Sequence, residues 1–295
     1  MAVGLRRQRD VDRRYGGDDC VLLEDDHAQR AQGVDVMNRF FKLIYFTLVF
    51  VFLYLPIFII ILYSFNNANF SALWHGITWK WYRLLFSDSA ILSVTVNSLV
   101  VGALAATFAT AIGTLGAVTI FKYRFFGRKL LHGLIFILII VPDLVFGISL
   151  LVLYSMLHLH LGFWTLLLAH VTFCIPFVMV TVYARLKDTN KHLFEAARDL
   201  GATELTVFWR IILPLMVPAI ISGWLLSFTL SIDDVIISFF VTGSDFQILP
   251  LYIYSAVHIG VTPEVNALVS LIFVATVTIV LTAYYFLRKQ HAKMG

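Results

Sequence analysis

The sequence predicts an all-α integral membrane protein with six transmembrane helices. Of its 295 residues, 60% are hydrophobic and 14% are charged, whereas a soluble domain carries roughly 25% charged residues. Stretches without Asp, Glu, Lys or Arg recur along the chain, and they are long enough to cross about 30 Å of hydrocarbon. A soluble enzyme would leave much of this apolar surface in water, so that class is excluded.

Residues 1–36 differ in composition from the rest of the chain. They hold six Arg and eight acidic residues without an apolar period, a composition typical of disorder. Met37 is followed by a short basic flank and then by an apolar run, as at a natural start. We therefore interpret 1–36 as a disordered or mis-assigned N-terminal extension, the alternative being a regulatory cytoplasmic tail, and 37–295 as the six-helix transmembrane domain.

The expected spans follow one another along the uncharged runs. The third run begins after Lys129 and is interrupted by Asp143, and Pro142 predicts a break there because proline removes a helix hydrogen bond. The stretch after Asp143 is too long for one helix, so we expect a turn at 158–162. The remaining spans are expected at 43–65, 89–121, 163–183, 211–240 and 265–287.

The charges of the connecting segments predict the orientation. The connections at 120–130 and 184–210, together with the C-terminal tail, hold 12 basic residues, whereas the opposite connections hold two. Basic residues are retained on the cytoplasmic side, so both termini and the 184–210 loop are expected in the cytoplasm. On the outer side, 77–86 and 249–258 are expected to form short interfacial helices.

The longest cytoplasmic connection, 184–214, predicts a helix–turn–helix. A short helix over 194–200 is expected to stop at Gly201, because glycine is the usual residue just after a helix end. Thr203 is a suitable N-cap for a second helix that leads into the fifth span. This loop has more apolar residues than a connection requires, which favours docking against a soluble partner.

The same loop resembles the EAA signature of ABC importer permeases. In that family the segment is the coupling helix, which sits in a groove of the ATPase subunit. The resemblance implies the type I (MetI-like) importer fold. It also implies an ATPase-coupling role for the residues that match the signature, which are Glu195, Ala196, Ala197, Gly201, Ile211, Leu213 and Pro214.

Further segments, such as 142–145, 226–235 and 248–255, are similar to the permeases of spermidine/putrescine importers, and the likeness covers roughly 37–289. It implies a non-catalytic subunit in the bacterial inner membrane that binds no cofactor itself, since ATP and Mg are held by the ATPase. The implied partners are a second permease subunit, two ATPase subunits, a periplasmic polyamine-binding protein and membrane lipid, without nucleic acid.

Three acidic residues, Asp143, Asp233 and Asp234, lie in or beside apolar spans. Each would cost about 2.5–3.5 kcal/mol near the centre of a bilayer. No Lys or Arg lies in any expected span, so we expect the counter-charge to come from water, a partner subunit or a cationic substrate. A polyamine fits the last source, and the three residues are candidates for the substrate path. The alternative is that they cap helix breaks or lie nearer the interface.

Other chemistry finds little support in the sequence. Two cysteines exclude a disulfide framework, and His158 and His160 alone do not make a metal site. No nucleophile–base pattern and no glycine-rich phosphate loop is present. A stand-alone secondary transporter or channel for organic cations remains the second hypothesis, and it would leave the amphipathic loop unexplained.

Overall fold

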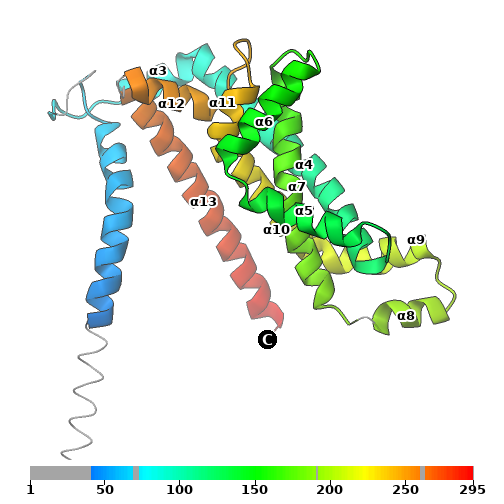
Figure 1. Ribbon diagram of the computed structural model, residues 1–295. Coiled ribbons are helices and arrows are strands. Elements are labelled where there is room, and N and C mark those ends of the chain that lie inside the picture. Colours follow the sequence, from blue (N-terminus) through cyan, green and yellow to red (C-terminus); the bar gives the residue numbers. More distant parts are fainter. Residues whose placement is uncertain (1–40, 69–72, 191, 260–262, 295) are drawn as a thin grey trace, which may run out of the picture. The chain divides into compact units, whose positions relative to one another are not determined.

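The computed structural model describes residues 41–68, 73–190, 192–259 and 263–294, with side chains up to Thr278 in the last range. These residues are largely helical, and among them one isolated β-bridge pairs Asn66 with Ile77 (Figure 1). The extension 1–36 lies outside the described residues. The chain divides into two compact units, Phe65–Leu268 and the two terminal segments Met1–Ser64 and Val269–Gly295, and each unit is described by itself.

The terminal unit contains the helix Phe41–Tyr63 and most of α13, which runs over Pro263–Met294. The first helix has 23 residues and a mean hydropathy of 2.7, which confirms an apolar helix long enough to span at 43–65. The expected sixth span, 265–287, falls on α13. Only Pro263–Thr278 has described side chains, and that apolar stretch is shorter than a membrane span, so the sixth span stays a prediction.

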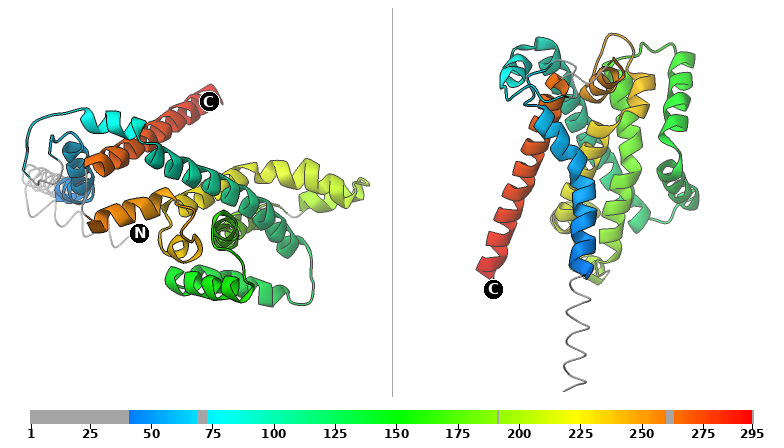
Figure 2. Two further views of the ribbon diagram at one scale, coloured as in Figure 1. Left: turned by 90° about the horizontal axis from the view of Figure 1, so that it is seen from above. Right: turned by 90° about the vertical axis from the view of Figure 1, so that its left-hand side faces the viewer.

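The core of the other unit is built from three long apolar helices, α4 (Ser89–Lys122), α7 (Phe163–Lys187) and α10 (Leu213–Asp233), which pack on one another (Figures 1 and 2). Glycines allow the close approach. A Cβ at Gly113 of α4 would meet the Cβ of Val178 at 2.8 Å, and one at Gly223 of α10 would meet Val178 Cγ1 at 3.3 Å. Small residues at helix contacts are the usual device of membrane bundles.

The third expected span is two helices rather than one. α5 (Arg128–Ile140) and α6 (Asp143–Met156) meet at an angle of 111°, so the break expected at Pro142 is confirmed. The turn expected at 158–162 is also confirmed, because α6 ends at Met156 and α7 begins at Phe163. Within the described residues, four helices are long and apolar enough to cross a membrane, or five if the bent pair is one span.

The fifth expected span ends earlier than predicted. α10 stops at Asp233, and a separate short helix, α11 (Ile236–Val241), follows. The expectation of a continuous helix to residue 240 is therefore wrong, because the side chain of Asp234 caps α11 instead of continuing α10.

The two short segments expected on the outer side are helices. They are α3 (Lys80–Ser87), which buries Trp81 and Leu85, and α12 (Leu249–Ile259). The Trp81 indole N–H donates to the backbone carbonyl of Asn66 at 2.8 Å, which fixes α3 to the segment that precedes it. Figure 1 shows α8 and α9, the helices of the 184–214 loop, at the opposite end of α7 from α3 and α12.

Candidate functional site

The break between α5 and α6 presents one of the acidic residues. Pro142, with φ −59° and ψ 137°, interrupts the helix, and Asp143 opens α6. A carboxylate in the first turn of a helix interacts favourably with the helix dipole. The Asp143 side chain is half-buried, and no side chain of the described residues pairs with it. The break therefore leaves a carboxylate available at the start of α6.

The break between α10 and α11 contains the two adjacent acids, and it separates them. Asp233 is the last residue of α10 and is exposed, whereas Asp234 is extended, with φ −68° and ψ 122°, and is buried. Within the described part of the chain, no neighbouring side chain bonds to Asp233. The two residues thus have different surroundings, although they are adjacent in sequence.

The buried carboxylate of Asp234, one position before the N-cap residue Val235, caps the start of α11. Its Oδ1 accepts from the Ile237 N–H at 3.2 Å, and its Oδ2 accepts from the Ser238 N–H at 2.8 Å. The Ser238 hydroxyl adds a further hydrogen bond to Oδ2 at 2.7 Å. The backbone N–H groups at the start of a helix have no partner within the helix, so this cap satisfies two of them and holds a buried charge at the same time.

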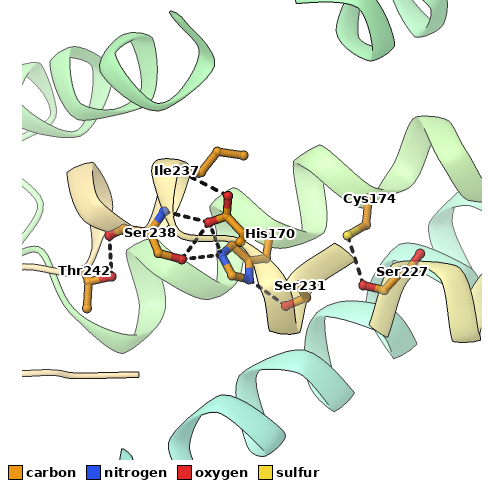
Figure 3. A network of polar contacts seen from close by, with 8 residues as sticks. His170, Cys174, Ser227, Ser231, Ile237, Ser238 and Thr242 are labelled. Atoms are coloured by element: carbon orange, nitrogen blue, oxygen red, sulfur yellow. Dashed lines mark hydrogen bonds and ion pairs between the residues drawn. The ribbon is translucent and has the colours of Figure 1, made fainter. Parts of the chain in front are cut away.

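His170 of α7 completes this network (Figure 3). Its Nε2 lies 3.3 Å from Oδ2 of Asp234 and 3.0 Å from the Ser238 Oγ. Its Nδ1 lies 2.6 Å from the Ser231 Oγ. Since Ser238 donates to Asp234, its oxygen is free to accept from Nε2–H, and Nδ1 then accepts from the Ser231 hydroxyl.

Asp234 has a partner within the chain that the expectation did not include. This partner is the imidazole of His170, which is not a Lys or Arg and which, in the tautomer above, is a neutral hydrogen-bond partner. A signal was present in the sequence, because His170 lies in the middle of an apolar span, where a polar group requires a partner. For Asp143 and Asp233 the origin of the counter-charge stays a prediction.

Packing of α6 on α11 brings the two breaks into one region. Gly147 of α6 makes the approach possible: a Cβ there would meet Phe240 Cδ2 at 3.0 Å and Ile237 Cα at 3.3 Å. Two of the three acids at these breaks, Asp143 and Asp233, are without a side-chain partner among the described residues, whereas Asp234 is bonded.

The 184–214 loop has the predicted helix–turn–helix form. α8 (His192–Asp199) is followed by Gly201 with φ +84°, and Thr203 caps α9 (Glu204–Val207) by accepting from the Thr206 N–H at 3.3 Å. A single turn of π-helix, Phe208–Ile212, then joins α9 to α10. The glycine stop and the threonine cap are both confirmed.

The residues that match the EAA signature divide between α8 and the entry to α10. Glu195 and Ala196 are exposed on α8, while Ala197 is half-buried. Ile211 lies in the π-helical turn, and Leu213 and Pro214 open α10. Beside them, Leu200 and Leu205 are 89% and 69% exposed. The loop therefore presents an apolar surface that its own helices do not cover.

An aromatic residue and an acid are among the residues that attach the loop to the membrane helices. Phe194 of α8 is buried in the core, and its ring lies 6.0 Å from that of Phe121 at the end of α4. Glu204 pairs with Arg198 at 3.0 Å and also with Lys122 of α4. α8 therefore contacts the end of α4 through Phe194, and Arg198 of α8 shares Glu204 with Lys122 of α4.

The described residues offer little other chemistry. Within the described ranges, no three His, Cys, Asp or Glu side chains are grouped so that they could hold a metal ion. Cys174 is buried, and its Sγ lies 3.5 Å from the carbonyl oxygen of Ser227 (Figure 3). The acidic breaks and the 184–214 loop remain the two candidate sites.

Comparison with known proteins points in the same direction. Residues 109–294 match the family described as binding-protein-dependent transport system inner membrane component. The chain is 49% identical over 244 residues to the spermidine/putrescine transport system permease protein PotC of Escherichia coli K12, covering 83% of this chain and 92% of that protein. It is 40% identical over 262 residues to the putrescine transport system permease protein PotI of the same organism, covering 86% and 93% of the two chains.

Solved structures support the fold. A chain from the crystal structure of a bacterial ABC transporter that imports the acidic polysaccharide alginate superposes with a TM-score of 0.68. The match covers 84% of this chain and 94% of that one at 17% sequence identity. At this identity the likeness concerns the fold alone.

Proposed function

Because the chain belongs to the family of binding-protein-dependent transport system inner membrane components, we propose that it is the permease subunit of an ATP-driven importer for polyamines. It is a multi-pass, non-catalytic membrane subunit, and spermidine and putrescine are the proposed substrates. The structural observation that carries the proposal is the pair of carboxylates, Asp143 and Asp233, at two neighbouring helix breaks. Polyamines carry several ammonium groups, which these carboxylates attract.

The proposed path uses the two breaks as cation sites. Broken helices at membrane depth are tolerated where they line a cavity, and acidic side chains there mark routes for cations. We assign Asp143 and Asp233 to contact with the ammonium groups of the substrate. Asp234, also a sequence candidate, is assigned the task of shaping the break, because its carboxylate already accepts hydrogen bonds from its own chain.

The proposed assembly contains a second permease subunit, two ATPase subunits and a periplasmic polyamine-binding protein. ATP and Mg are held by the ATPase, and this chain binds no cofactor. The exposed surface of α8 supports the ATPase contact, with Glu195, Ala196, Ala197, Gly201, Ile211, Leu213 and Pro214 as the coupling residues. Nucleotide-driven movement of the ATPase then reaches α4 through Phe194 and Glu204.

The proposed location is the bacterial inner membrane, with both termini in the cytoplasm. The basic residues at 120–130, at 184–210 and in the C-terminal tail support this orientation. It places α8 on the side where ATP is found. Surface labelling of single cysteines at positions 190 and 245 in intact cells tests it, and labelling at 190 from outside would contradict it.

The proposed function is tested with the complete complex in proteoliposomes. Labelled spermidine and putrescine should enter only when ATP, the binding protein and this chain are all present. The matched control is a complex that lacks this chain. Uptake without the ATPase would contradict the proposal and would favour the second hypothesis, a stand-alone transporter or channel for organic cations.

A further inference from the structure

His170 has an unusual position among the polar groups of the membrane helices. Its side chain is 1% exposed, and it belongs to α7, whereas all the partners of its ring lie in or around the break between α10 and α11. Ser231 stands before the break, Asp234 within it, and Ser238 after it. One imidazole therefore holds both sides of the break from a third helix.

This arrangement fixes the direction of Asp233 as well. Successive side chains point to opposite sides of an extended backbone, and Asp234 is extended, so its inward direction turns Asp233 to another side. If the break slipped by one residue, the exposed and buried aspartates would exchange places. The contacts of His170 on both sides oppose such a slip, because Ser231 and Ser238 would both be displaced from the ring nitrogens that they now bond.

We propose that His170 is a positioning residue for cation passage: by holding Asp234 and Ser231 it fixes the break between α10 and α11, and the fixed break turns Asp233 outward to the transported cation. This inference rests on the proposed function. His170 itself touches no substrate. Its effect on transport passes through the direction of the Asp233 carboxylate.

The direction of residue 233 is measured by its reactivity. Asp233→Cys in the assembled complex, in a Cys20→Ser background, is treated with a small cationic methanethiosulfonate reagent, and the rate of modification is recorded. The parent with Asp233 intact gives the background, to which the buried Cys174 adds little. The rate is then compared for His170 intact, His170→Gln, His170→Asn and His170→Leu.

The parent and the three substitutions distinguish a positioning role of His170 from a role in packing alone. Gln extends far enough to donate to Asp234, whereas Asn is polar but too short, and Leu has no donor. We expect a rate near that of the parent with Gln, and a rate lowered about tenfold or more with Asn and Leu, since the break loses hydrogen bonds to a charged group. Because Asn remains polar, it decides the question even if the Leu variant does not assemble.

Equal rates of thiol modification with His170 intact and in all three substitutions would overturn the positioning role of His170. The proposed function is tested separately, by spermidine uptake into proteoliposomes through the complex that retains both Asp233 and His170. Absence of that uptake would contradict the polyamine path, while the comparison of modification rates would still decide whether His170 fixes the break.

Discussion

The break between α5 and α6 and the break between α10 and α11 each place an aspartate where an apolar segment is interrupted, and they hold that aspartate differently. At the first, Pro142 breaks the helix through its backbone, and Asp143 needs no partner to keep the break open. At the second, the break depends on a side-chain network around Asp234 and His170. An acid in an apolar span can therefore shape a helix break instead of binding a transported cation. Its hydrogen-bond partners distinguish these two roles.

The largest effect is expected from Asp234→Asn. The amide cannot accept from all the donors that now converge on the carboxylate, and each buried donor left without an acceptor costs about 1–3 kcal/mol. We expect the amount of assembled complex and its thermal stability to fall strongly. Size-exclusion chromatography and thermal unfolding of the solubilised complex measure this. A complex of normal amount and stability would show that the network does not hold the break.

Asp143→Asn and Asp233→Asn test the other side of the comparison, the acids without a side-chain partner. These side chains have no side-chain partner in the described part of the chain, so removal of the charge should leave assembly intact or improve it. Spermidine uptake should fall about tenfold for each, the effect of losing roughly 1.4 kcal/mol of attraction for the cation. Initial uptake rates per assembled complex are the measurement. Normal rates in both variants would remove them from the path.

A smaller effect is expected in the 184–214 loop. Gly201 has φ +84° with open space around its Cα, so Gly201→Ala costs about 1 kcal/mol of backbone strain and no steric clash. We expect weaker co-purification of the ATPase with normal membrane insertion. Gly127, with φ +88° and equally open space, is the matched control outside this loop. Equal losses for Gly201→Ala and Gly127→Ala would contradict a specific coupling role.

The smallest effect is expected from deletion of residues 2–36. This segment has no apolar face to pack against the membrane domain, so assembly and uptake should be unchanged. Quantitative immunoblotting at matched expression accompanies the uptake assay. Loss of uptake at equal expression would instead identify the segment as a functional tail.

The sequence predicts features that depend on local chemistry and misses those that depend on distant partners. Pro142 and Gly201 impose their conformations through their own backbones, so the break and the helix stop were foreseeable. The end of α10 at Asp233 was not, because Asp234, which caps α11, is buried against His170, and this residue is 61 and 68 residues away in sequence from its other partners, Ser231 and Ser238. Hydropathy does not distinguish the two sides of that break, since both are apolar.

The candidate site follows the same division. The sequence predicts the three acids because charged residues are rare in apolar spans, and it predicts the coupling loop because the EAA signature is a pattern of residue types. It does not predict that Asp233 is exposed and Asp234 buried, because adjacent identical residues differ only in what surrounds them. The π-helical turn at Phe208–Ile212 likewise has no composition that distinguishes it from an ordinary helix.

The most direct test of the different roles of the three aspartates is a cryo-electron microscopy structure of the complete complex with spermidine in the membrane path. We expect ammonium nitrogens within about 4 Å of the carboxylates of Asp143 and Asp233, while Asp234 remains bonded to His170 and Ser238. Spermidine bound to Asp234 with His170 displaced, or bound far from all three aspartates, would contradict the account.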